Sequence, residues 1–200
     1  MLFGCRILAP KGTIFNVNTL PTHEQAAYLA LYQKLPLGQF SVIETDSSLV
    51  ISSDDVRQFQ FLIQHRLFPI WMMIGTPPLG PDFNIIEELP YQQIPFQSDV
   101  VTLYKDCITA IKKALIPIIV IPESVNRYDF IGAFIAHGHI HKWIYVTDTA
   151  PLLDSHNTSI SFINLSSLTQ ESIHRDPSHY DRLLAYLDWG PRLPFCDMAL

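Results

Sequence analysis

A chain of 200 residues is long enough to bury one hydrophobic core without disulfide or metal staples, and it is short for two domains. Its 19 acidic and 13 basic side chains leave a net charge of -6, and no basic cluster is longer than Lys112-Lys113, so nucleic acid is not an expected partner. Charged residues make up 16% of the chain, against about 25% in typical soluble domains, and this deficit favours an apolar patch that a protein partner or a second copy covers.

The three cysteines, Cys5, Cys107 and Cys196, are far apart and odd in number, which is not the pattern of a disulfide framework. Arg6 interrupts the N-terminal apolar run and no basic segment precedes it, so no signal peptide is predicted. No apolar stretch approaches the roughly 18 residues that suggest a membrane span. We therefore expect a soluble, cytoplasmic, acidic protein without a membrane span.

Turn signals divide the first part of the chain into short strands and two helices. Thr22 and Gln25 fit a capping box that begins a helix, and Pro36 ends it. A second helix is predicted to begin near Ser53 and to stop before Pro69. The strand patterns cover residues 2–8, 13–17, 39–44, 49–52 and 70–74.

Glycine or proline at positions 75, 77, 78, 80 and 81 predicts a long Pro-rich loop over residues 75–97. Such a loop is a binding surface or a packed crossover, and we favour the crossover.

After this loop the pattern alternates again. Ser98 is predicted to cap a helix. The helix over residues 123–136 is apolar nearly all round at its end and is expected to be buried, with Gly138 just beyond it in a left-handed conformation. A last helix is expected between Asp176 and Gly190. Strands are predicted at residues 116–121, 140–147 and 159–164. Residues 189–200 form an apolar C-terminal tail that either folds back onto the domain, which we favour, or docks on a partner.

Together these elements predict an α/β (or α+β) fold. It is a single domain over residues 1–200, in which a mixed β-sheet carries about five helices.

The stretch AHGHIHKW raises the possibility of a metal site, because His137, His139 and His141 occupy alternate positions. On a strand, His139 and His141 point to one side together with Trp143, and on a helix His137 and His141 are one turn apart, so either geometry can chelate. No spacing singles out a third ligand or a carboxylate. The favoured interpretation is that the histidines lie on the wet face of an antiparallel strand, and one transition metal such as zinc is the alternative.

Two hypotheses for function follow. Because no catalytic motif is complete, the first is a non-catalytic interaction protein: an adaptor, a chaperone-like protein or a component of a larger assembly, with no cofactor. The second is a small metal-dependent hydrolase built on His137, His139 and His141. Cys107 is predicted to be a small buried hydrophobe. The candidate partner-binding residues are Trp71, Phe83, Tyr91, Phe96, Trp189 and Phe195.

Overall fold

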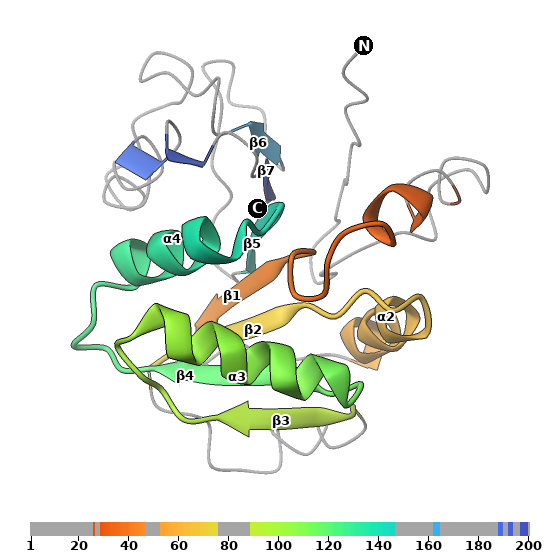
Figure 1. Ribbon diagram of the computed structural model, residues 1–200, viewed down its shortest axis with the longest axis horizontal. Helices are drawn as coiled ribbons and strands as arrows, with labels where there is room; N and C mark the ends of the chain where they lie inside the picture. The colour runs from red at the N-terminus through yellow and green to blue at the C-terminus, as the bar shows by residue number, and fades with distance from the viewer. Residues whose placement is uncertain are drawn as a thin grey trace.

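Figure 1 shows the fold in a computed structural model. The structure describes residues 26, 29–46, 53–75, 89–146, 162–164, 188–189, 192–193 and 197–199. Within these residues, seven strands form one sheet, and helices α2 (Ser53–Gln64), α3 (Val100–Lys112) and α4 (Arg127–Gly138) pack on it. The strands are β1 (Val42–Asp46), β2 (Ile70–Ile74), β3 (Tyr91–Ile94), β4 (Ile116–Ile121), β5 (Lys142–Val146), β6 (Phe162–Asn164) and β7 (Asp197–Ala199).

The strand order in the sheet is β3-β4-β2-β1-β5-β7-β6. Every neighbouring pair is parallel except β6 and β7, which are antiparallel. This confirms the predicted single α/β domain with a mixed sheet. The chain passes from β1 to β2 on one side and later returns from β4 to β5 on the other side of β1, so the strand order reverses at β1.

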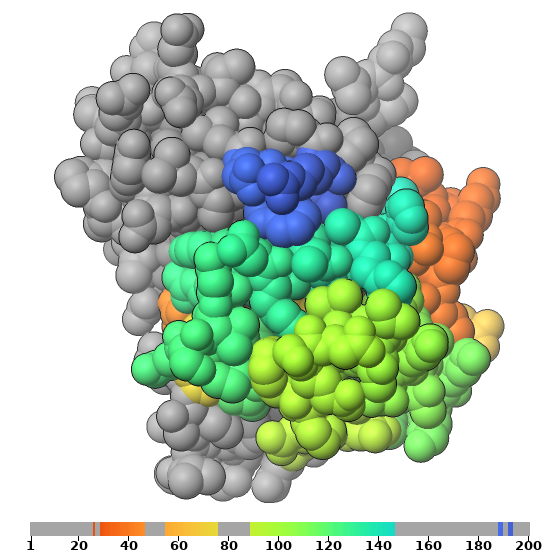
Figure 2. All heavy atoms as spheres, turned by 60° about the vertical axis from the view of Figure 1, so that its left-hand side comes forward, coloured from red at the N-terminus to blue at the C-terminus, as the bar shows by residue number. Residues whose placement is uncertain are grey.

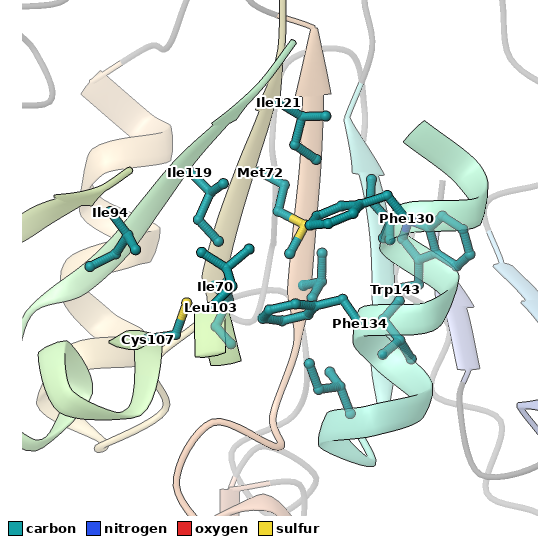
Figure 3. Close-up of a cluster of buried hydrophobic side chains, with 14 of the residues drawn as sticks. Ile70, Met72, Ile94, Leu103, Cys107, Ile119, Ile121, Phe130, Phe134 and Trp143 are labelled. Atoms are coloured by element: carbon teal, nitrogen blue, oxygen red, sulfur yellow. The ribbon is translucent and has the colours of Figure 1, made fainter. Parts of the chain in front are cut away.

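Each face of the sheet carries its own hydrophobic core. On one face, α3 and α4 lie side by side over the strands (Figure 1). Figure 3 shows Phe130 and Phe134 of α4 beside Met72 of β2, and Leu103 of α3 beside Ile70 of the same strand. On the other face, α2 contributes Val56, Phe59 and Leu62, and Phe59 stacks on Trp71 with ring centroids 5.0 Å apart. With helices on both faces, the central strands are buried on both sides.

Strand β5 was expected to have one solvent-exposed face, but both of its faces are buried. Trp143, which was predicted to lie on the same face as His139 and His141, is 0% exposed; Tyr145 on that face is 2% exposed, and Ile144 on the opposite face is 3% exposed. The prediction is wrong because β5 is a central strand that pairs in parallel with both β1 and β7, and α4 covers its aromatic face.

Three helices end in the same way, each with a non-glycine residue in the left-handed conformation: Arg66, Ala114 and His139. After α3, the amide of Ala114 donates to Ile111 and the amide of Leu115 donates to Ala110. These two bonds form a Schellman motif, which satisfies carbonyl groups that the helix end would leave open.

The predicted N-cap of α3 and the predicted left-handed residue after α4 are each one residue away from the observed position. The left-handed position after α4 is His139, whereas Gly138 lies within the helix and leaves room for the Tyr104 ring. The N-cap of α3 is Asp99, one residue beyond the predicted Ser98, and its carboxylate accepts from the amides of Val101 and Thr102.

We expect Ala114→Gly to raise the free energy of unfolding by about 1 kcal/mol, because a left-handed conformation costs an L-residue roughly 1–2 kcal/mol that glycine avoids. Denaturant unfolding measures this change. Ala136→Gly, within α4, is the matched control and should destabilise by about 1 kcal/mol. A destabilised Ala114→Gly variant would contradict the assigned helix end.

Two of the predicted irregular segments contain strands. Within the predicted loop of residues 75–97, Tyr91–Ile94 forms the edge strand β3, which pairs with β4. Within the predicted tail of residues 189–200, Asp197–Ala199 forms β7 against β5, so this part folds back onto the sheet as expected.

Several predictions lie wholly or partly outside the described residues. Residue 26 and residues 29–32 are helical, in agreement with the first predicted helix, and residues 188–189 are helical at the end of the last one. The predicted strands at residues 2–8, 13–17 and 49–52 are outside the described part. None of the helices that the structure describes is long and apolar enough to cross a membrane.

Candidate functional site

A group of polar side chains gathers at the carboxyl ends of β1 and β5, where the strand order reverses. In Figure 1 the arrows of β1 and β3 point to this edge, at the left of the view, where α3 and α4 also begin. Open parallel sheets bind ligands outside the carboxyl ends of their strands, next to such a reversal. We call this group the carboxyl-edge cluster: Glu44, Asp46, Arg127, Tyr128, Trp143 and Tyr145.

Arg127 is the centre of the cluster because it is the first residue of α4, directly after the N-cap Asn126. Its Nη1 donates to Oδ1 of Asp46 at 2.8 Å, and its Nη2 donates to the hydroxyl of Tyr128 at 2.9 Å. Its Nε lies 3.6 Å from Oε1 of Glu44. One guanidinium therefore joins the start of α4 to two carboxylates of β1.

Strand β5 contributes two aromatic donors in a repeated arrangement. Nε1 of Trp143 donates to Oε2 of Glu44 at 2.9 Å, and the hydroxyl of Tyr145 donates to Oδ2 of Asp46 at 3.0 Å. In the parallel register Glu44 lies opposite Tyr145, so each donor reaches the carboxylate two residues beyond its own partner. The register of β1 and β5 thus sets the geometry of the cluster.

Burial divides the two carboxylates into an inner and an outer one. The Glu44 side chain is 0% exposed, whereas 37% of the Asp46 side chain is exposed, and Arg127 between them is 24% exposed. Glu44 is therefore a structural anion that holds Arg127, and Asp46 is the carboxylate that solvent or a ligand can reach.

The cluster carries more negative than positive charge when both carboxylates are ionised. Burial alone would lower the pKa of the Arg127 guanidinium, but its hydrogen bond to Tyr128 and the charge of Glu44 outweigh burial and raise that pKa above its ordinary value. Arg127 is thus a permanent cation whose N–H groups already point to protein acceptors. The arrangement favours a ligand that supplies hydrogen-bond donors to Asp46.

The three histidines of the metal hypothesis lie on different elements. His137 is exposed in the last turn of α4 and its ring meets that of Tyr104 edge-on, with centroids 5.6 Å apart. His139 is the exposed left-handed residue after α4, and His141 precedes β5, where its amide donates to the carbonyl of Gln39. Across the described residues, no group of three or more His, Cys, Asp or Glu side chains is placed to hold a metal ion.

Four of the predicted partner-binding residues, Trp71, Tyr91, Phe96 and Trp189, lie in the part of the chain that the structure describes. Trp71 is 0% exposed and donates from Nε1 to Oγ1 of Thr45, and Trp189 is 8% exposed. Both indoles belong to the hydrophobic cores, so they offer a partner no exposed ring. Tyr91 and Phe96 are half-buried. Phe83 and Phe195 are outside the described residues.

None of the six cluster residues was predicted as a site. The available signal was the sequence Glu44-Thr45-Asp46, two acidic residues at the end of an otherwise apolar strand. In a sheet that is buried on both faces, acidic residues at a carboxyl end are unusual enough to be examined as a site.

Comparison with the models of known protein families and with curated protein sequences finds no match for this chain. Its function is therefore inferred from the geometry of the fold and the cluster alone.

Cys107 is buried against the sheet, as predicted (Figure 3). Burial, assisted by the charge of Asp106, raises the pKa of its thiol to about 12. A Cys5→Ser, Cys196→Ser variant should therefore resist a thiol reagent in the native state and react once unfolded. Because the folded pKa is raised, the stability that the neutral thiol contributes should be lost as the pH rises from about 8.5 towards 12, and Cys107→Ala should remove this loss. Rapid labelling of the native protein would contradict the described burial.

Proposed function

We propose that this protein binds a small molecule rich in hydrogen-bond donors, a polyol or an amine, at the carboxyl edge of β1 and β5. One observation carries the proposal: a partly exposed carboxylate, Asp46, lies at the reversal of the strand order and is held in place by Arg127 and Tyr145. This is where parallel α/β sheets bind their ligands. A carboxylate held by two donors keeps further lone-pair capacity for hydroxyl or ammonium groups.

An anionic ligand fits this edge less well. The guanidinium of Arg127 is the only cation of the cluster, and its hydrogen bonds go to Asp46 and Tyr128. An arriving phosphate or carboxylate would face Asp46 directly and would have to displace these bonds. Like-charge repulsion at a partly desolvated site opposes this exchange.

Thermal-shift measurements with four probes test the proposal: adenosine and glucose as polyols, spermidine as an amine, and inorganic phosphate as the anion. Binding to the folded state raises the midpoint of unfolding. We expect a polyol or the amine to raise it and phosphate to leave it unchanged. Asp46→Asn should weaken binding at least tenfold. Glu123→Gln, which removes the same charge from an exposed residue after β4, should not.

Stabilisation by phosphate alone would overturn the proposal, as would binding that Asp46→Asn leaves intact. The outcome with adenosine and glucose against spermidine distinguishes the two ligand classes.

A second candidate function is that of a protein-protein interaction subunit, an adaptor or a component of a larger assembly. The observation that favours it is the exposure of Leu31 (61%) and Leu37 (46%), two large apolar side chains near one another in the sequence. Gel filtration of the purified chain tests it, since an isolated subunit should self-associate or be stabilised by its partner.

We place the protein in a reducing compartment such as the cytoplasm as part of the same proposal. The free, buried thiol of Cys107 and the absence of a disulfide pattern in the sequence support this location.

A further inference from the structure

The edge of the sheet opposite the carboxyl-edge cluster is hollowed. A cavity of about 450 Å³ lies where residues 32–40 meet the ends of α2 and α3. We call it the amino-edge hollow. Its lining includes the rings of Tyr32, Phe40 and Phe68, the side chain of Leu37, and the cations Arg66 and Lys112. A volume of this size is within the range of binding pockets.

The charge around the amino-edge hollow is opposite in sign to that of the chain. The residues that line it include two cations, Arg66 and Lys112, and no aspartate or glutamate, although the whole chain has a net charge of -6. The Nζ atom of Lys142 lies 5.0 Å from the centroid of the Tyr32 ring, which is part of the lining. The hollow therefore presents positive charge beside apolar side chains.

The hollow is held in shape by contacts within the fold. The Tyr32 ring meets Phe40 edge-on with centroids 5.4 Å apart, and Nε2 of Gln33 donates to the carbonyl of His65 at 3.2 Å. At the end of α2, the amides of Arg66 and Leu67 donate to Ile63 and Leu62, so these helix carbonyls already have donors. A preformed pocket loses little entropy when it is filled.

We propose that the amino-edge hollow is a docking site for an acidic segment of a partner protein, anchored by apolar side chains. Charge complementarity selects the acidic partner, because the two charged residues in the lining, Arg66 and Lys112, are both cations and no acidic residue lines the hollow. Leu37 lines the hollow and is 46% exposed, which favours an apolar anchor on the same segment. The proposal concerns a surface separate from the carboxyl edge, and it rests on the second candidate function alone.

A photo-crosslinking side chain at the hollow tests this proposal in cells that make the protein naturally. Leu37→benzoylphenylalanine places the reactive group at the hollow, and Val101→benzoylphenylalanine places it at the first turn of α3, where Val101 is 37% exposed at the opposite edge. Each crosslinking variant is also made with the charges of the hollow reversed by the double substitution Arg66→Glu, Lys112→Glu. The matched control reverses Arg57 of α2 and Lys105 of α3, two exposed residues.

The expected result is a product at position 37 and not at position 101, in which the attached partner segment is acidic and contains apolar residues. Reversal at the hollow should reduce its yield at least tenfold, and the Arg57→Glu, Lys105→Glu control should leave it unchanged. A product that survives reversal at the hollow overturns the proposal, as does one with the mass of two copies of this chain.

Native mass spectrometry of the same preparations distinguishes a failure of the proposed docking site from a failure of the proposed interaction function. A bound partner without a product at position 37 overturns the hollow and leaves the interaction function standing. A chain that carries no partner overturns both. Asp46→Asn should leave the crosslink unchanged, which keeps the test independent of the ligand site.

Discussion

Replacing Arg127 with methionine is expected to lower the free energy of unfolding by roughly 3–5 kcal/mol, since this is the usual cost of breaking a buried ion pair. The substitution keeps much of the apolar stem and removes the only cation of the cluster. Glu44, whose side chain is 0% exposed, would keep its bond from Trp143 and lose the charge that balances its own. Urea unfolding at neutral pH measures the loss.

A double-mutant comparison isolates the electrostatic part of this effect. Glu44→Gln removes the buried charge and keeps an acceptor for Trp143, so Arg127→Met in the Glu44→Gln background should cost at least 1 kcal/mol less than in the wild type. Equal costs in both backgrounds would show that Arg127 stabilises the protein by packing alone, and the assigned pairing with Glu44 would be wrong.

Gly132→Ala is expected to destabilise the protein by about 2–3 kcal/mol and to release the Trp189 ring. Gly132 lies in the middle of α4, and a Cβ atom there would overlap three atoms of the Trp189 indole. Figure 2 shows the described C-terminal residues, in blue, packed directly on α4. Release of the ring should move the tryptophan emission to longer wavelength, because Trp189 is only 8% exposed in the fold.

The background variant Trp189→Leu provides the control. With the indole removed, Gly132→Ala should cost no more than about 1 kcal/mol, because the overlapping atoms are gone. Unchanged emission together with unchanged stability of Gly132→Ala would contradict the packing of residue 189 on α4.

Elements with strong local signals were predictable from the sequence. The apolar runs Ile70–Ile74 and Ile116–Ile121 are flanked by Pro or Gly and were predicted with the bounds that the structure has. The beginning of α2 at Ser53 was predicted from the acidic residues after it. Local composition is enough to predict these two strands, because a strand that is buried on both faces is apolar throughout and does not alternate apolar with polar residues.

The role of β5 was not predictable from the same kind of signal. The alternation of His139, His141 and Trp143 with Ile140 and Ile144 is typical of a strand with one wet face. In the fold both faces are covered, and the two histidines precede the strand. Burial here depends on which strands become neighbours, and that information comes from the order β1-β5-β7 in the sheet.

The carboxyl-edge cluster was missed for a similar reason. Asp46 and Arg127 are 81 residues apart, and each of the two aromatic donors is 99 residues from its carboxylate. Each residue alone has an ordinary local explanation, such as a strand end or the first turn of a helix. Only the parallel register of β1 and β5 and the start of α4 bring them together.

Mapping of backbone amide shifts by NMR locates the bound ligand on the protein. On titration with whichever of adenosine, glucose and spermidine stabilises the protein most, we predict shifts at Asp46, Arg127 and Val146, at the carboxyl edge. The amides of Leu37 and Arg66 at the amino-edge hollow should not shift. Shifts confined to the hollow, or no shift with any of the three probes, would contradict the account.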